Sequence, residues 1–468
     1  MRTLETLLVL ACLWTMLRLA NHPVDDRLPA TLACVVIVLL AAQLVFEGWR
    51  TPFLPVYPVA VGLLAWAWLF LPLRGPQSLV AAGLVLLLLG AAVGGCLILP
   101  SRILRPLEGP YPVGTVTMEL DRRTRSDTAS RYETFRPEPS VRLWYPAQIV
   151  PVRLGRELHL SARMRERLRE VQLEPAIDGA PVGGKEPVPV LIYFPGWPGT
   201  RLQNLSLVRE LASQGYLVAS VEYPARTPGT SDGTFEDEVR RLDRPMQNYA
   251  SDALFHESLV ANDERLRHNV DDVSRILTRL TVLNGSGPAN RLTGRLNLGR
   301  VGIVGYSFGG AVAAEARRLD PRIKAAVNID GRHYGSALSH GVPAPYMFVG
   351  EELLTPSATE LHSPDPATRY EAMLDEVDYA NLAKHLRENG GIQVTVANTT
   401  HPNFCDDVLR SPVTRLTGGG RIDAQRALDI LNRFVVNFFD RVLRDGASPM
   451  LTAPSPTFPE VRVDVYRQ

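Results

Sequence analysis

Cysteine is scarce in this 468-residue sequence, which contains only four. Cys12, Cys34 and Cys96 lie in apolar N-terminal stretches, so Cys405 stands alone in the rest of the chain and forms no internal disulfide there. No Cys-x-x-Cys pair exists, and His256 and His268 are too far apart for a zinc-binding His-Glu-x-x-His helix. We therefore expect neither a disulfide framework, nor a metal site, nor a cofactor.

An excess of charge of either sign is also missing. The chain has 50 Lys and Arg residues against 49 Asp and Glu residues, for a net charge of +1. Nucleic-acid binding needs a concentrated basic surface, so the charge balance argues against nucleic acid as a partner. A hydrophobic content of 46% excludes disorder as the main state of the chain.

Long uncharged runs are concentrated in the first hundred residues. Three runs contain no charged residue: Leu28–Phe46, Phe53–Leu73 and Ser78–Leu99. As a helix, each would span roughly 30 Å, the thickness of a bilayer core. The linkers between them are short and hold Glu47, Arg50 and Arg74, so the pattern predicts antiparallel membrane-spanning helices.

An earlier stretch, Leu4–Ala20, is interrupted by Glu5 and Arg18. It fits a fourth span, an interfacial helix or the core of a signal sequence, so three or four spans remain open. With four spans, arginines on the side of the two termini outnumber those opposite by one, which favours a cytoplasmic location for the rest of the chain. The two sets are Arg2, Arg50, Arg102 and Arg105 against Arg18, Arg27 and Arg74. The sequence thus predicts an integral, multi-pass membrane protein with a transmembrane region at residues 1–105.

After Arg102 short apolar runs alternate with amphipathic stretches. Strands are expected at Val188–Phe194, Tyr216–Tyr223, Arg300–Tyr306, Ala325–Ile329, Pro345–Gly350 and Ile392–Asn398. Helices are expected at residues 205–214, 308–319, 366–388 and 422–444, and around 273–280. This alternation predicts an α/β fold with a mainly parallel sheet that helices cover on both faces.

Other segments are expected at the margins of this core. Thr115–Leu120 and Ser140–Pro146 are predicted to form an antiparallel edge pair. Residues 150–186 and the acidic residues 227–244 are expected to leave the core, and the second stretch to cover a cleft. We expect one α/β domain at residues 106–446 and an extended, Pro-rich tail at residues 447–468.

The segment Gly305-Tyr306-Ser307-Phe308-Gly309 fits the pattern Gly-x-Ser-x-Gly. A strand is expected before it and a helix after it, and so tight a turn requires small residues two positions on either side of the serine. The start of the helix favours a developing negative charge. Ser307 is therefore the candidate nucleophile. A dinucleotide-binding turn is the alternative, but the third glycine and the strand-end acid of such a site are missing.

A serine nucleophile needs a histidine base, which an acid holds in one tautomer. Behind such a turn the order along the chain is serine, acid, histidine. His401 is the candidate base, because it alone follows a core strand in a short loop before the last helix. The other downstream histidines are His333, His340, His362 and His385. Asp330 ends one strand and Glu351 and Glu352 end the next, so position alone leaves Asp330 and Glu352 as alternative acids.

The oxyanion of an acyl-transfer intermediate needs two backbone N–H donors. Phe308 supplies the first in this type of turn, and the loop after an early strand supplies the second. That loop is Tyr193–Gly199. Pro195 and Pro198 have no N–H, so Trp197 is the candidate second donor.

These residues resemble the plasma-type (isoform II) platelet-activating-factor acetylhydrolases, serine-dependent phospholipases with the α/β-hydrolase fold. The resemblance covers most of the chain from Gly109 onward. It is carried by GPYPVG (109–114), RLWYPAQ (142–148), LASQGYLVASVEY (211–223), GYSFGGA (305–311), NID (328–330) before APYMFVGEE, and THPNF (400–404). The resemblance implies Ser307, Asp330 and His401 as the catalytic triad, and so favours Asp330 over Glu352. It also implies oxyanion donors at Phe308 and Trp197.

The chain departs from the family pattern at Tyr306, where the family usually has His, and at Pro195-Gly196, where it has His-Gly. The apolar N-terminal runs are not part of the secreted family's pattern either. The resemblance implies a serine ester hydrolase for short-chain or modified acyl esters, with sn-2 acyl groups of phospholipids as candidate substrates. Together with the apolar N-terminal runs, it leads us to expect a membrane-anchored enzyme. A general carboxylesterase for small soluble esters and a catalytically inactive membrane scaffold are the alternatives. The acyl-chain length and the oligomeric state stay open.

Overall fold

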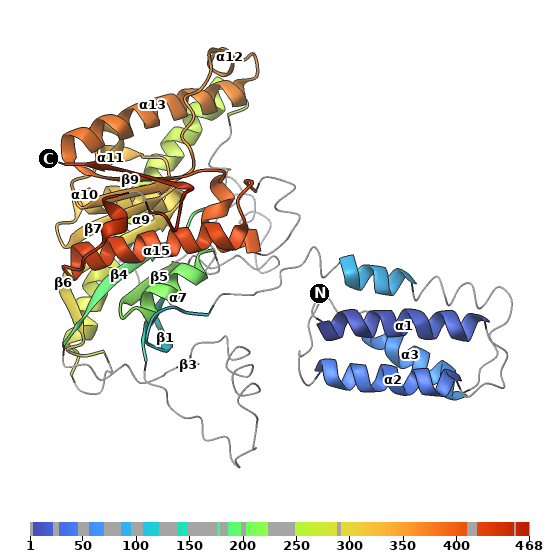
Figure 1. Ribbon diagram of the computed structural model, residues 1–468. Coiled ribbons are helices and arrows are strands. Elements are labelled where there is room, and N and C mark those ends of the chain that lie inside the picture. The colour runs from blue at the N-terminus through green and yellow to red at the C-terminus, as the bar shows by residue number, and fades with distance from the viewer. Residues whose placement is uncertain are drawn as a thin grey trace, which may run out of the picture. The chain divides into compact units, whose positions relative to one another are not determined.

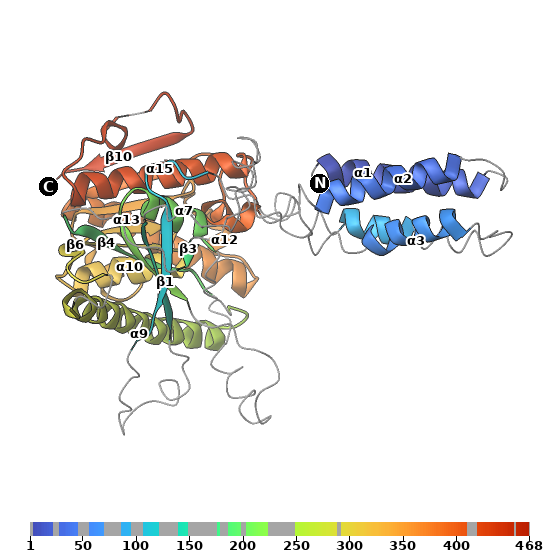
Figure 2. The ribbon, with the colours of Figure 1, turned by 90° about the horizontal axis from the view of Figure 1, so that it is seen from below.

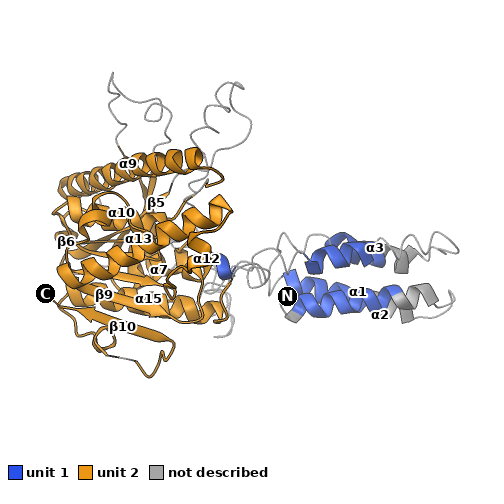
Figure 3. Ribbon diagram, turned by 90° about the horizontal axis from the view of Figure 1, so that it is seen from above, with its two compact units in different colours: residues 1–103, 407–418 blue, residues 104–406, 419–468 orange. Residues whose placement is uncertain are grey.

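The computed structural model describes residues 3–21, 28–44, 56–69, 86–94, 106–120, 139–147, 176–177, 186–197, 203–222, 249–287, 292–409, 419–453 and 455–467. The chain forms two compact units (Figure 3). One consists of residues 1–103 and 407–418, and the other of residues 104–406 and 419–468.

The first unit contains the helices α1 (Thr3–Asn21), α2 (Leu28–Ala42) and α3 (Val56–Leu69) and a further helix at residues 86–94. Apolar side chains from these helices pack together, among them Leu8, Val36 and Leu63. At about 1.5 Å per residue, the 15 residues of α2 and the 14 of α3 fall short of the roughly 30 Å of a bilayer core.

None of the helices in the described part of the chain has both the length and the apolar character required to span a bilayer. The prediction of an integral, multi-pass membrane protein is therefore wrong. The cytoplasmic location inferred from that prediction loses its basis. For α2 and α3 the reason is helix length: the uncharged runs 28–46 and 53–73 are longer than the helices that form within them.

The second unit is built on a sheet with the strand order β10-β9-β8-β7-β6-β4-β5-β2-β1-β3 (Figure 1). The strands are β1 (Val113–Met118), β2 (Ser140–Pro146), β3 (Ala176–Ile177), β4 (Val188–Phe194), β5 (Leu217–Glu222), β6 (Leu296–Tyr306), β7 (Ile323–Ile329), β8 (Tyr346–Gly350), β9 (Gly391–Val396) and β10 (Val461–Tyr466). Neighbours from β5 through β9 run parallel, whereas β1 with β2, β2 with β5, and β9 with β10 are antiparallel. The predicted α/β class with a mainly parallel sheet is confirmed.

Helices cover both faces of this sheet. The helices after β4 are α7 (Leu205–Ser213), α9 (Asp252–Gly285), α10 (Phe308–Leu319), α11 (Gly335–His340), α12 (Ala358–Leu361), α13 (Pro366–Asn389) and α15 (Ala424–Leu443). The chain also forms the short 3-10 helices η3 (His401–Phe404), η4 (Asp406–Leu409) and η5 (Pro449–Leu451). The α9 and α10 helices lie on one side of the strands and α15 on the other (Figure 2). Along β4, Val190 and Ile192 enter one apolar cluster and Leu191 and Tyr193 the other, which explains why this strand is a continuous apolar run.

Two parts of the second unit differ from the elements expected from the sequence: the helix α9 is longer, and the C-terminal tail contains a strand of the sheet. α9 extends over 34 residues from Asp252, and the hydroxyl of the preceding Ser251 accepts the Leu254 N–H. Within the expected C-terminal tail, β10 pairs antiparallel with β9 and lengthens the sheet. The predicted excursion at residues 227–244 lies outside the described residues, as does almost all of residues 150–186.

Candidate active site

Ser307 occupies a sharp turn between β6, which ends at Tyr306, and α10, which begins at Phe308. Its φ of 54° lies in the left-handed region, a strained conformation for a residue with a side chain. The turn leaves no space beside the serine: a Cβ added to Gly305 would lie 1.9 Å from the Gly309 carbonyl oxygen. A Cβ added to Gly309 would lie 2.1 Å from the Phe194 carbonyl oxygen. Both glycines of the motif are thus required by close backbone approach.

His401 begins η3, five residues beyond the end of β9, and faces the serine. Its Nε2 lies 3.0 Å from Ser307 Oγ, and its Nδ1 lies 2.7 Å from Asp330 Oδ2. The three residues form one hydrogen-bonded chain, although 71 positions separate Asp330 from His401 and 94 separate Ser307 from His401. The imidazole side chain is 41% exposed, so it borders solvent or substrate on one side.

Asp330 follows directly after β7 and is the acid that contacts His401. Its side chain is 5% exposed. Its Oδ1 accepts the backbone N–H of Glu351 at 3.1 Å, and its own N–H donates to the Val349 carbonyl at 2.8 Å. The other candidate acid, Glu352, is exposed and does not line the cavity at Ser307.

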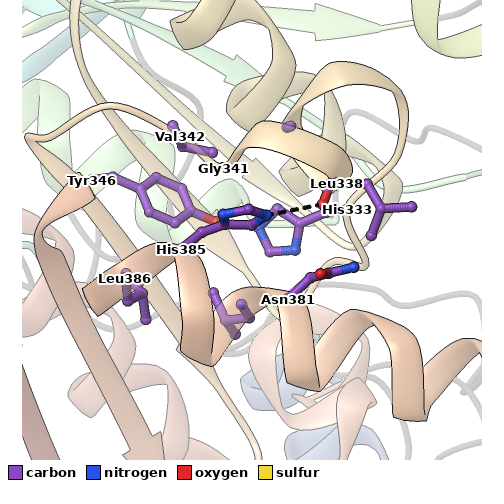
Figure 4. Close-up of a pocket in the computed structure, with 10 residues that line it drawn as sticks. His333, Leu338, Gly341, Val342, Tyr346, Asn381, His385 and Leu386 are labelled. Carbon is purple, nitrogen blue, oxygen red and sulfur yellow. Dashed lines mark hydrogen bonds between the residues drawn. The ribbon is translucent and has the colours of Figure 1, made fainter. Parts of the chain in front are cut away.

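The remaining downstream histidines lie elsewhere. His333 and His385 line a separate small cavity of about 10 Å³ (Figure 4). His333 Nδ1 lies 2.9 Å from Asp378 Oδ1, and His385 Nε2 lies 3.2 Å from the Leu338 carbonyl oxygen. The other two, His340 and His362, are exposed.

A cavity of about 400 Å³ opens at Ser307. Both predicted oxyanion residues, Phe308 and Trp197, line this cavity. A Cβ added to Gly196 would lie 2.9 Å from Ser307 Cβ, so the loop before Trp197 passes directly beside the serine. The guanidinium of Arg265 lies 4.3 Å from the centre of a Trp197 ring and packs against the indole.

Charged side chains form another wall of the same cavity. Arg332 Nη2 lies 2.6 Å from Glu371 Oε1 and 2.5 Å from Asp375 Oδ1. Burial lowers the pKa of Arg332, but the two carboxylates outweigh this effect and hold it above its usual value. This ion pair and the hydrogen bond between His333 and Asp378 tie α13 to the loop after Asp330.

Sequence reasoning missed most of this wall and the contacts of Tyr306. The ring of Tyr306 stacks on the imidazole of His401, and its hydroxyl donates to the His401 carbonyl. Two features of the sequence could have indicated the role of Tyr306: its position directly before the serine, and the departure from the family pattern at this position. Arg332, Glu371 and Asp375 carry no motif, and they meet only because α13 folds across the loop after β7.

His401 and its neighbour Glu351 have displaced pKa values. Burial lowers the pKa of His401, but the hydrogen bond and charge of Asp330, together with the charge of Glu351, raise it above 6.5 overall. Burial is the main cause that raises the pKa of Glu351 to about 7, and Asp330 and Asp375 add to it. His401 opposes that shift.

Comparison with known proteins identifies relatives of this chain. The family model described as platelet-activating factor acetylhydrolase, isoform II, matches residues 98–446. A probable 1-alkyl-2-acetylglycerophosphocholine esterase of Arthroderma benhamiae is 25% identical over 294 residues, which cover 60% of this chain and 67% of the relative. The platelet-activating factor acetylhydrolase of Cavia porcellus is 22% identical over 359 residues, 72% of this chain and 77% of the relative.

A solved structure is similar as well. The ferulic acid esterase from Streptomyces cinnamoneus superimposes with a TM-score of 0.52 at 25% sequence identity, over 77% of this chain and 98% of that one. The resemblance noted in the sequence is thus confirmed by comparisons that cover most of the chain. The chain is an ester hydrolase and belongs to the platelet-activating factor acetylhydrolase isoform II family.

Proposed function

We propose that the protein hydrolyses short-chain or modified acyl esters, including sn-2 acyl groups of phospholipids, with Ser307 as nucleophile. The carrying observation is the hydrogen-bonded chain from Asp330 through His401 to Ser307, with contacts of 2.7 Å and 3.0 Å. Nucleophile, base and orienting acid need this order and this reach. These three residues line the cavity of about 400 Å³, so a substrate carbonyl has access to the serine.

In the proposed mechanism, Ser307 Oγ attacks the ester carbonyl carbon as His401 Nε2 accepts the hydroxyl proton. Asp330 holds the imidazole in the correct tautomer and stabilises its positive charge. The N–H groups of Phe308 and Trp197 bind the tetrahedral oxyanion. His401 then protonates the leaving alkoxide, which leaves an acyl-serine. Water attacks the acyl carbonyl and gives a proton to His401. His401 then passes this proton to Ser307 Oγ as the bond between the acyl carbon and Oγ breaks, which releases the carboxylic acid and restores free Ser307.

The composition of the cavity supports a short or polar acyl group. Trp197 and Phe308 crowd the serine, and the wall that contains Arg332, Glu371 and Asp375 is charged. A long alkyl chain would have to lie against these charges and desolvate them without compensation. An acetyl or polar-ended acyl group avoids that free-energy cost.

A carboxylesterase for small soluble esters is the second candidate. The same charged wall favours it, and the similar solved structure is described as a ferulic acid esterase. The two candidates differ in the alcohol that they release. A phosphocholine ester and a simple aryl ester with the same acetyl group therefore separate them by their ratio of kcat/KM.

The test is hydrolysis of a matched series of phosphocholine lipids and aryl esters with acyl groups from acetyl to palmitoyl. We expect kcat/KM to fall steadily with chain length in both series. A maximum on palmitoyl substrates would contradict the acyl preference. A fluorophosphonate probe should label the protein and the Ser339→Ala control but not Ser307→Ala, because Ser339 is exposed and does not line the cavity. Labelling of Ser307→Ala would contradict the proposed nucleophile. An absence of ester hydrolysis by the wild type would contradict the proposed function and favour the inactive scaffold.

A further inference from the structure

Glu351 lies at the end of β8 and touches both partners of the acid–base pair. Its backbone N–H donates to Asp330 Oδ1 at 3.1 Å. Its carboxyl group lines the cavity and interacts with the backbone N–H of His401. A Cβ added to the preceding Gly350 would lie 2.4 Å from Asp330 Oδ1, so this segment is held close against the acid. The mechanism above assigns no role to the Glu351 side chain.

We propose that Glu351 is a positioning residue that joins the loop of His401 to the strand end beside Asp330 and supplies a second negative charge to that pair. The inference rests on the proposed roles of Ser307, His401 and Asp330. The backbone of Glu351 orients one carboxylate oxygen of Asp330, which leaves the other for His401. Its carboxyl lies near the main-chain N–H of His401, the first residue of η3, and the favourable interaction between them holds the loop of His401.

The charged surroundings give the second part of this role. Asp330, His401, Asp375 and Tyr379 line the same cavity as Glu351, and the charges of Asp330, His401 and Asp375 act on its carboxyl. Asp375 and Tyr379 belong to α13. Arg332, on the loop after β7, lines the same cavity and lowers the pKa of His401. Within this group, the negative charge of Glu351 raises the pKa of His401, and the positive charge of His401 lowers that of Glu351.

Because the two side chains influence each other, their protons leave in coupled steps rather than independently. An ionised Glu351 stabilises the imidazolium that forms when His401 takes the proton of Ser307. A protonated Glu351 withdraws that support, but it keeps its place in the main-chain contacts. The charge of Glu351 and its interaction with the His401 N–H can therefore be separated by substitution.

The experiment measures kcat/KM against pH for Glu351→Gln and Glu351→Ala, with Glu352→Gln as control. Glu352 has the same charge and is the next residue, but it is exposed and outside the cavity. Glu351→Gln keeps an acceptor for the His401 N–H and removes the charge, so the midpoint of the acidic limb should move down by about 0.5 pH unit or more. Glu351→Ala loses the acceptor as well, and its plateau should fall by at least about fivefold below that of Glu351→Gln.

Glu352→Gln should leave both the midpoint and the plateau as in the wild type. An unchanged midpoint in Glu351→Gln, or an equal shift in Glu352→Gln, would overturn the proposal. Thermal unfolding of each variant shows whether a loss of activity comes from unfolding. Partial unfolding lowers the plateau of kcat/KM but does not move the midpoint of its acidic limb. Ser307→Ala in the same assay separates the proposed function from the proposed role of Glu351. Residual hydrolysis by Ser307→Ala contradicts the proposed function. An inactive Ser307→Ala, together with an unchanged midpoint in Glu351→Gln, contradicts only the role of Glu351.

Discussion

The ring of Tyr306 lies nearly parallel to the imidazole of His401, with ring centres 4.9 Å apart and an angle of 21° between the planes. The Tyr306 hydroxyl also donates to the His401 carbonyl oxygen at 3.1 Å. The residue directly before the candidate nucleophile thus holds the candidate base by both its face and its hydroxyl. This contact links the end of β6 to η3, which lies 95 positions later in the chain.

Tyr306→Phe should keep the stacking and lose the hydrogen bond. One such bond contributes about 1 kcal/mol, so we expect kcat/KM to fall by roughly three- to tenfold with little change in KM. Tyr306→Leu also loses the aromatic face and should be more damaging. Tyr370→Phe is the matched control, because the hydroxyl of Tyr370 bonds Asp252 and lies outside the cavity. Equal effects at positions 306 and 370 would contradict a specific role for Tyr306.

Asp330→Asn should leave the fold intact and lower kcat by several orders of magnitude. An amide at position 330 no longer favours the tautomer in which Nδ1 carries the proton, and in serine proteases the equivalent loss is about ten-thousandfold. The measurement is steady-state hydrolysis of an acetyl ester, with far-UV circular dichroism as a check of folding. A mild Asp330→Asn together with a severe Glu352→Gln would show that the acid has been assigned to the wrong strand.

The pH profile of kcat/KM should have an acidic limb governed mainly by His401. The base works only when it is neutral, so activity is lost as pH falls through its pKa. The net effect of Asp330 and Glu351 raises that pKa, which places the midpoint above the ordinary histidine value of 6.5. A midpoint below 6.5 in the wild type would contradict this direction.

Gly305→Ala should destabilise the protein by at least about 1–3 kcal/mol, because the new methyl group would meet the backbone of Gly309. Gly285→Ala is the control, since it lies in α9 with no atom within 4 Å of the added Cβ. That change should be neutral or stabilise by up to about 1 kcal/mol. Urea unfolding measures both free energies. Similar values for the two variants would mean that the turn tolerates a side chain.

We expect ester hydrolysis to continue in EDTA. In the proposed mechanism the oxyanion is stabilised by the N–H groups of Phe308 and Trp197, which a chelator does not affect. The measurement is the initial rate of acetyl-ester hydrolysis after dialysis against EDTA. Complete loss of the rate, with recovery on addition of calcium, would point to a different chemistry.

Local pattern was sufficient for much of the second unit. The apolar runs predicted β4 and β2 with the bounds that the structure shows, and α10 likewise, because buried strands and amphipathic helices have characteristic periods. The sterically required Gly305 and Gly309 were also evident from sequence. Local pattern failed in the first unit, where hydropathy predicted spans. An uncharged run shows that burial is favourable, but not how long the helix within it will be.

The sequence by itself determined the strand-turn-helix at Ser307, the order of the sheet-forming segments and the small set of histidines and acids that follow them. Only the tertiary structure decided which of these groups meet. The choice of Asp330 over Glu352 as the partner of His401 depends on how neighbouring parallel strands end and on the direction in which each side chain points. The wall of Arg332, Glu371 and Asp375 depends on the packing of α13, and the contact of Glu351 with Asp330 depends on the neighbouring ends of β7 and β8. These contacts join residues that are far apart in the sequence. The periodicity of the sequence carries information only about residues a few positions apart, so it does not predict such contacts.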